Sequence, residues 1–155
     1  MCLSSFLVLR KDGDRKSVLM GHLNPNAPWE HIGALDPSRV EAHSKGWMLP
    51  SSHLIIHESP KEAACRIARE QLGIPDLELS ETKIFSEVYT PRRFPNLQSH
   101  WDLEFIFMGF IHENQLHRQA AWNDLKFVFP ELTPRSDFAR SHDEILENLG
   151  FKIGM

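Results

Sequence analysis

Residues 47–74, with the sequence WMLPSSHLIIHESPKEAACRIAREQLGI, decide the fold of this chain. The second half of this stretch marks the start of a helix residue by residue. Ser59 suits the N-cap, and Pro60 suits the first helical position, where its missing N–H costs nothing. Glu62 completes a Ser-x-x-Glu capping box with Ser59. These residues predict that a helix begins at about Pro60.

The end of the same helix is marked as clearly as its start. Gly73 can adopt the left-handed conformation that commonly follows a helix, and Pro75 prevents the helix from continuing. The sequence therefore predicts a helix over residues 60–72. Before it, residues 47–56 form an apolar-rich run that we expect to be extended, so the stretch is a strand, a loop and a helix.

This unit resembles the signature of the Nudix superfamily, which reads G, five residues, E, seven residues, R-E-U-x-E-E-x-G-U, where U is aliphatic. With the first glutamate placed on Glu58, the matching positions are Arg66, Glu70, Gly73 and Ile74. The motif resemblance covers residues 52–74, and it gives Glu58, Arg66 and Gly73 structural roles. It implies an α/β fold, a Nudix-like α/β/α sandwich with a mixed β-sheet, formed by residues 1–155 as one domain.

Three positions depart from the signature. Ser52 stands where the first glycine is expected, Ile67 where the glutamate after the arginine is expected, and Gln71 where the second of the paired glutamates is expected. In Nudix hydrolases the glutamates of this helix hold the divalent metals that bridge the substrate diphosphate. At about 100° per residue, positions 67, 70 and 71 share one arc of the helix, so only Glu70 offers a carboxylate there.

A single carboxylate limits the metal chemistry that the resemblance implies. Mg²⁺ often uses one or two protein carboxylates together with substrate phosphates and waters. We therefore expect a weak Mg²⁺ or Mn²⁺ site with Glu70 as ligand and catalytic residue, and too little charge for a multi-metal cluster. In this interpretation Ile67 presents an aliphatic surface where a metal-bound water should be.

The helix also has a purely structural interpretation. Glu62, Arg66 and Glu70 have the i, i+4, i+8 spacing of a solvent-exposed salt-bridge ladder. The apolar residues of the helix would then form its core stripe, which consists of Ala63, Ala64, Ile67, Ala68 and Leu72.

Residues outside the box can supply further site groups. Glu104 is the strand-borne candidate for an additional catalytic carboxylate, and its rivals are Glu87, Glu113 and Asp124. For substrate binding, Arg92 and Arg93 in a proline-braced loop suit phosphate oxygens, because guanidinium groups bind them bidentately. These two arginines have a plain alternative as solvated loop residues.

The loops on either side of residues 47–50 carry the other substrate-binding candidates. Ser51 and Ser52 keep their loop small and polar, which suits hydrogen bonding to phosphate. Trp29 either stacks on a base or anchors its long loop on the core. His53 and His57 offer imidazole ligands for a softer metal, but in an extended segment they lie too far apart to chelate one ion.

The remaining pattern predicts strands on both sides of the helix and a helix near each end of the chain. Residues 3–10 and 17–23 are expected to pair as a hairpin around Asp12 and Gly13. Asp36 and Pro37 suit the start of a short helix through about Ser44. The other expected elements are strands at residues 83–89, 100–111 and 122–129 and a last helix from Ser136 or Asp137 to Leu149.

Composition excludes several classes of protein. The 155 residues, 41% hydrophobic and 25% charged, fit one globular domain. A formal charge of -4 argues against general nucleic-acid binding, which requires a basic surface. No run has the length or flanks of a signal peptide or membrane span, and Cys2 and Cys65 indicate neither a disulfide framework nor a zinc site. We expect a cytoplasmic protein, with a homodimer possible.

Two functional hypotheses follow from these observations. The first is a domain that binds a nucleoside diphosphate linked to another group, a small-molecule partner, and has weak or no Mg²⁺-dependent pyrophosphohydrolysis. The second is an active hydrolase of such compounds that uses Glu70 with a carboxylate from elsewhere, such as Glu104. A protein-binding role without a nucleotide is a third possibility.

Overall fold

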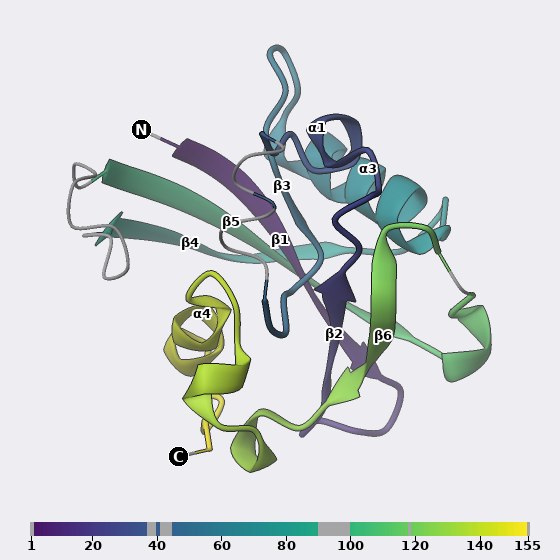
Figure 1. Ribbon diagram of the computed structural model, residues 1–155, viewed down its shortest axis with the longest axis vertical. Coiled ribbons are helices and arrows are strands. Elements are labelled where there is room, and N and C mark those ends of the chain that lie inside the picture. Colours follow the sequence, from purple (N-terminus) through teal and green to yellow (C-terminus); the bar gives the residue numbers. More distant parts are fainter. Residues whose placement is uncertain (1, 37–39, 41–44, 90–99, 118, 155) are drawn as a thin grey trace.

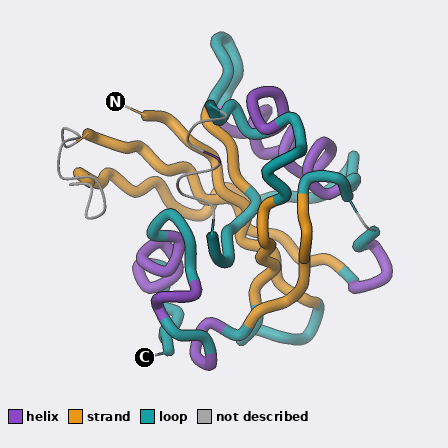
Figure 2. Tube along the Cα trace, viewed as in Figure 1, coloured by secondary structure: helices purple, strands orange, loops and turns teal. Residues whose placement is uncertain are grey.

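The computed structural model describes residues 2–36, 40, 45–89, 100–117 and 119–154, and its chain path is drawn in Figures 1 and 2. None of the described helices is long and apolar enough to cross a membrane. The elements that build the fold are β1 (Cys2–Lys11), β2 (Val18–Leu23), α1 (Trp29–Ile32), β3 (Ser51–His53), α3 (Pro60–Leu72), β4 (Ser80–Tyr89), β5 (His100–Ile111), β6 (Trp122–Val128) and α4 (His142–Asn148).

The main sheet is mixed and has the strand order β3-β1-β5-β4. The central strand β1 runs antiparallel to β3 and parallel to β5, while β4 runs antiparallel to β5. A second sheet consists of β2 and β6, which are antiparallel. Gly21 of β2 also forms a bridge to Met48, which places the run before β3 beside the second sheet.

The predicted hairpin of residues 3–10 and 17–23 is wrong, although both strands exist. Ser5 of β1 lies opposite Ser52 of β3 on one side and Phe105 of β5 on the other, so both edges of β1 are occupied. The chain turns at Gly13, which has a φ of 79°, and β2 then joins β6, where Val18 lies opposite Val128. The turn residues are local signals, whereas the strand partners are fixed by contacts distant in sequence.

Both faces of the main sheet are covered, which confirms the predicted α/β/α sandwich with a mixed sheet. Leu7 of β1 belongs to the apolar cluster that contains Ile67 of α3. Phe6, which points to the opposite face, belongs to the cluster that contains Leu146 of α4. Helices α1 and α3 accordingly lie across the sheet from α4 (Figure 1).

Helix α3 begins and ends where the sequence predicts. The Ser59 side chain accepts a hydrogen bond from the Glu62 N–H, and the Glu62 carboxylate accepts one from the Ser59 N–H. At the other end Gly73 has a φ of 69°, and its N–H donates to the carbonyls of Ala68 and Arg69. A residue with a β-carbon is strained in that conformation, which is why glycine suits this position.

The last helix is shorter than predicted. A 3-10 turn occupies Arg135–Asp137, and α4 begins only at His142. Arg140 and Ser141 separate the two, with φ values of 54° and 60° that a right-handed helix cannot contain. The helix ends at Asn148, and Gly150 follows with a φ of 95°.

The other predicted elements agree with the observed bounds to different degrees. Strand β5 has the predicted bounds, whereas β4 begins at Ser80, before the predicted start at Lys83. Of the extended run at residues 47–56, only Ser51–His53 forms a strand of the main sheet. The short helix expected from Asp36 falls mostly on residues 37–39 and 41–44, outside the described part of the chain.

We expect Ser59→Ala to lower the free energy of unfolding by about 1 kcal/mol, because the Glu62 N–H loses its capping acceptor at the start of α3. Urea unfolding monitored by circular dichroism measures the change. Ser136→Ala, at an exposed serine outside the helices of the sandwich, serves as the control and should shift stability by much less. Equal effects of the two substitutions would contradict the capping role.

Candidate functional site

The side chain of Arg66 joins α3 to α1, to β3 and to the loop that precedes the helix. Its guanidinium group donates to the Glu58 carboxylate at 2.7 and 3.0 Å, and residue Arg66 as a whole is only 7% exposed. The same group donates to Ser52 Oγ at 2.8 Å and to the carbonyls of His53 and Ile32 at 3.2 and 3.1 Å. The buried charge is therefore paired and almost fully hydrogen-bonded, as burial of an ion requires.

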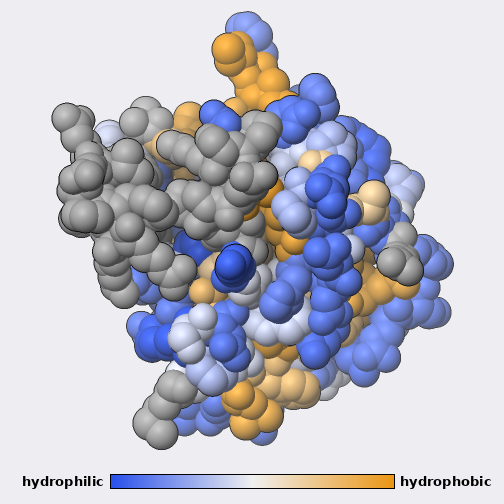
Figure 3. All heavy atoms as spheres, viewed as in Figure 1, coloured by the Kyte–Doolittle hydropathy of each residue, from blue (hydrophilic) through white to orange (hydrophobic). Residues whose placement is uncertain are grey.

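Glu58, in the loop before the helix, forms an ion pair with this buried charge. Burial raises the pKa of the Glu58 carboxyl, but the hydrogen bond from Arg66, the hydrogen bond from the Ile55 N–H and the charges of Arg66 and Arg69 outweigh it. The net result is a pKa below the ordinary value. The loop itself projects from the molecule and exposes Ile55 and Ile56, and an apolar projection is visible at the top of Figure 3.

Gln71, which stands where the Nudix signature has a glutamate, makes contacts that a carboxylate cannot make. Its amide Nε2 donates to the carbonyl of Ile32 at 2.9 Å and to that of Ser51 at 2.7 Å, and the residue is fully buried. Both partners are acceptors, so the position requires a donor, and an ionised carboxylate has none. Gln71 thus ties α3 to the end of α1 and to the start of β3.

Ile67 is fully buried in the core cluster that includes Leu7, Leu19 and Phe107. The expectation that it presents an aliphatic surface to a metal-bound water is therefore wrong. Its place in the core stripe of the helix, the structural alternative, is correct, because the α3 stripe packs directly on the sheet.

Glu70 is the one box carboxylate on the accessible side of the helix. Its side chain is 34% exposed and lies 3.9 Å from the guanidinium groups of both Arg66 and Arg69. The expected ladder is only partly present, because Glu62 is used in the N-terminal cap. Within the described residues no group of three or more His, Cys, Asp or Glu side chains is arranged to hold a metal ion. These donors do not fit a multi-metal cluster.

Glu104 lies on the opposite face of the sheet from α3. In the strand register Glu104 lies between Ser4 of β1 and Phe85 of β4, and it is only 2% exposed. It shares its face with Ile106, which packs in the α4-side cluster. The structure therefore separates Glu70 and Glu104 by the thickness of the sheet.

The rival carboxylates have other surroundings. Glu87 accepts a hydrogen bond from Asn148 at 3.4 Å, and Glu113 forms an ion pair with Lys11 at 2.9 Å. Asp124 lies on the second sheet, in β6, and is exposed.

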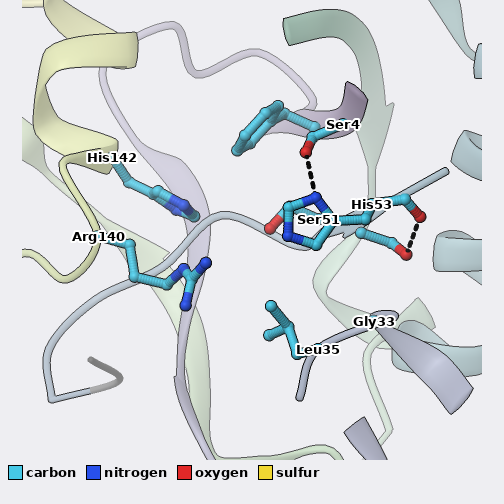
Figure 4. Close-up of a pocket in the computed structure, with 9 residues that line it drawn as sticks. Ser4, Gly33, Leu35, Ser51, His53, Arg140 and His142 are labelled. Carbon is cyan, nitrogen blue, oxygen red and sulfur yellow. Dashed lines mark hydrogen bonds between the residues drawn. The ribbon is translucent and has the colours of Figure 1, made fainter. Parts of the chain in front are cut away.

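A small recess of about 40 Å³ opens on the α4 side of the sheet (Figure 4). Its walls come from four segments distant in sequence. In Figure 4, Arg140 and His142 face Ser4 and His53 across it, and Ser4 Oγ lies 3.0 Å from His53 Nδ1. The lining residues are Ser4, Phe6, Gly33, Leu35, Ser51, Ser52, His53, Arg140 and His142.

His142 contributes a neutral, fixed imidazole to this recess. Its Nδ1 accepts a hydrogen bond from the Leu49 N–H at 2.8 Å, and its ring packs edge-on against Phe6 with the centroids 5.4 Å apart. Burial, aided by the positive charge of Arg140, lowers the pKa of His142 to about 3. Because Nδ1 accepts, the proton of the neutral ring resides on Nε2, which is a hydrogen-bond donor.

The backbone at the recess is strained. Arg140 and Ser141 have left-handed φ values of 54° and 60°, and Ala34, between the lining residues Gly33 and Leu35, has a φ of 50°. Such residues cost free energy and persist where the surrounding structure requires a particular geometry, often at a binding site. The sequence did not indicate Arg140 and His142 as site residues, because the helix predicted over residues 136–149 leaves no turn at Arg140 and Ser141 to direct their side chains.

This chain is similar to known proteins in fold, but its sequence matches none of the families or curated proteins compared. Among solved structures, a MutT protein from Methanosarcina mazei Go1 aligns with 96% of this chain and 92% of its own, at a TM-score of 0.63 and 14% identity. This chain has the Nudix fold.

Two further structures with the Nudix fold are similar. The NUDIX domain of Shewanella oneidensis NrtR, solved with ADP ribose, aligns with 98% of this chain and 78% of its own, at a TM-score of 0.52 and 14% identity. A MutT/nudix family protein from Enterococcus faecalis aligns at a TM-score of 0.52 and 20% identity over 81% of this chain. This chain spans only 42% of that protein.

The residues predicted to bind substrate lie in different surroundings in this fold. Trp29 is 1% exposed, donates from Nε1 to the Asn24 carbonyl at 2.8 Å and packs edge-on against Trp122. It anchors its loop, and its ring is not presented to a ligand. Ser51 and Ser52 line the recess, but Ser52 Oγ already accepts from Arg66 and donates to the His53 carbonyl. Arg92 and Arg93 lie outside the described residues.

Restoring the box glutamate by Gln71→Glu should destabilise the protein by at least about 2 kcal/mol at neutral pH, since a carboxylate would face two carbonyl oxygens. Burial should raise the pKa of the new carboxyl, so the protonated folded form gains stability as the pH falls. Gln71→Met, which removes the amide without adding a charge, is the matched control. Its destabilisation should not depend on pH in this way, and the same pH profile in both variants would contradict the account. Denaturant titrations at several pH values measure both.

His142 should remain neutral from pH 8 down to about pH 4, because burial lowers its pKa to about 3. The unfolded chain binds this proton near the ordinary histidine pKa, so stability falls as the pH drops below about 6.5, by up to about 1.4 kcal/mol per pH unit. His142→Asn keeps a side-chain polar group and should remove this part of the slope, whereas His31→Asn, at an exposed histidine, should not. Imidazole NMR titration reads the pKa directly, and protonation of His142 above pH 5 would contradict the structure.

Proposed function

We propose that this chain is a Nudix-fold domain that binds a nucleoside diphosphate linked to another group, with Mg²⁺-dependent pyrophosphohydrolysis weak or lost. The observation that carries the proposal is the structural use of two box positions. Ile67 is core, and Gln71 is a buried donor to two carbonyls, so neither position contributes charge at a diphosphate. Without that charge, neither water activation nor neutralisation of a leaving phosphate is adequately supplied.

The recess on the α4 side supports ligand binding. It combines a cationic group, Arg140, with the neutral donor of His142 and the polar groups of Ser51 and His53. A few convergent polar groups at a preformed concavity are typical of small-molecule sites. The recess is too small for a whole nucleotide derivative, so in this proposal it receives one polar end of the ligand.

For the rest of the ligand, the proposal uses two arginines that the sequence indicates, whose placement the structure does not describe. In the proposal, Arg92 and Arg93 meet the distal phosphate or sugar. Glu70, exposed beside Arg66 and Arg69 on the α3 side of the sheet, is the one box carboxylate left to take Mg²⁺ or Mn²⁺, weakly, and its separation from the recess is one reason to expect hydrolysis to be weak or lost. The ADP ribose bound by the Shewanella oneidensis NUDIX domain supports the choice of ligand class.

A second candidate is an active hydrolase of the same compounds that uses Glu70 and Glu104. The observation that favours it is the position of Glu104, a nearly buried carboxylate beside Ser4, which lines the recess. The separation of Glu70 from Glu104 across the sheet makes a shared metal site the weaker proposal.

We expect calorimetry with ADP-ribose, nucleotide sugars and dinucleoside polyphosphates to detect binding of at least one compound, with little phosphate or nucleotide release in Mg²⁺ or Mn²⁺. Arg140→Asn should weaken that binding about tenfold or more, because it removes a charged hydrogen-bond donor while asparagine tolerates the left-handed backbone. Arg15→Asn, on the exposed turn between β1 and β2, is the matched control and should bind normally.

Turnover decides between the two candidates. Metal-dependent hydrolysis that Glu70→Gln abolishes, and that Glu78→Gln on the surface leaves intact, would replace the binding proposal with the hydrolase. Absence of both binding and turnover across the panel would contradict both and favour a role without a nucleotide.

A further inference from the structure

Strand β4 presents an edge that no other described strand pairs with. It is the last strand in the order β3-β1-β5-β4, and Figure 1 shows it at the border of the sheet. It has ten residues, and those from Ser80 to Val88 are exposed except for Phe85 and Glu87, which are half-buried. An edge strand of this length offers a row of backbone donors and acceptors to another strand.

The face of β4 that points away from α4 is also apolar and uncovered. Ile84 is 56% exposed and Val88 is 70% exposed, and in the strand register Val88 lies opposite Trp101 of β5, which is 47% exposed. Solitary exposed apolar residues are ordinary, but these three share one face at one edge of the sheet. β4 contains no proline, and its register irregularity lies near its start, between Glu81 and Lys83, so the strand from Lys83 onward keeps a regular edge.

We propose that β4 is a homodimer interface, in which β4 of a second copy pairs with it antiparallel about a two-fold axis at Phe85. The regular part of the strand begins at Lys83, because a register irregularity lies between Glu81 and Lys83. In an antiparallel pair centred on Phe85, Lys83 lies opposite Glu87 of the second copy. The two-fold symmetry forms this pair of opposite charges twice.

The register is selected by charge. Pairing centred on Lys83 or on Glu87 places that residue opposite itself, and pairing centred on Ile84 places Lys83 opposite Phe85. Like charges directly opposite one another on paired strands are destabilising, whereas opposite charges stabilise. Pairing centred on Ile84 or on Ser86 avoids a like-charge pair but forms no pair of opposite charges. Centring on Phe85 alone joins Lys83 to Glu87.

The apolar face is consistent with the same register. With Phe85 on the axis, Ile84 lies opposite Ser86 of the second copy and diagonal to its Val88. Diagonal neighbours on paired strands are within reach of long side chains. Pairing therefore removes apolar surface from water on one face of β4 while it forms the ion pairs on the other, and both features point to a second copy of this chain as the occupant.

The test is a charge exchange followed by sedimentation velocity over a series of protein concentrations. We expect the wild-type chain to dimerise, and Lys83→Glu or Glu87→Lys alone to raise the dimer dissociation constant about tenfold or more, because each creates like-charge pairs at two symmetric positions. The double variant K83E/E87K should restore dimerisation, since the pairs of opposite charge re-form with exchanged signs.

Matched controls separate this effect from general changes of charge or stability. Lys16→Glu and Asp76→Lys make the same charge changes at exposed positions away from β4 and should leave dimerisation unchanged. Asn148→Ala removes the hydrogen bond to Glu87 within one chain and should also have no effect. Circular dichroism verifies that each variant is folded.

Hydrogen exchange provides an independent readout. Amides of β4 should exchange more slowly at high protein concentration, while those of β6 should not change. A wild-type chain that remains monomeric, a dimer indifferent to both single reversals, or a double variant that stays as weak as the single ones would overturn the proposal. None of these outcomes depends on nucleotide binding, so a failure of the dimer proposal does not affect the proposed function, which is tested separately.

Discussion

The buried guanidinium group of Arg66 is the interaction on which the rest of this Nudix fold depends. Arg66 is held by Glu58 from the preceding loop and in turn holds the Ser52 hydroxyl and the carbonyls of Ile32 and His53. A buried cation without these partners would cost several kcal/mol, so helix, loop and strand must adopt one mutual arrangement. The strand that lines the recess is therefore positioned by the helix on the far side of the sheet.

The same constraint accounts for the structural roles of Gln71 and Ile67. Gln71 donates to the Ile32 carbonyl that Arg66 also uses, and to the carbonyl of Ser51. Ile67 fills the core between α3 and β1. Both side chains support the arrangement that the Arg66 network defines, and a charged group at either position would oppose it. Glu70 alone remains on the accessible surface, between two arginines.

Polar side chains also gather on the other side of the sheet, around the recess. Left-handed residues at Arg140 and Ser141 end one turn and begin α4, and they direct Arg140 and His142 toward Ser4 and His53. The imidazole stays neutral because it is buried and its Nδ1 accepts from the Leu49 N–H. Local backbone strain and a fixed tautomer are thus parts of one preorganised wall.

The sequence alone determined the features that rest on local physics. The ends of α3 follow from Ser59, Pro60 and Gly73, whose preferences act within one helical turn, and the box spacing was sufficient to predict the fold. Only the tertiary structure decided which strands pair, that Ile67 and Gln71 are buried, and that Arg140 and His142 line a recess. Those outcomes depend on contacts between distant segments, and a pattern of neighbouring residues does not specify them.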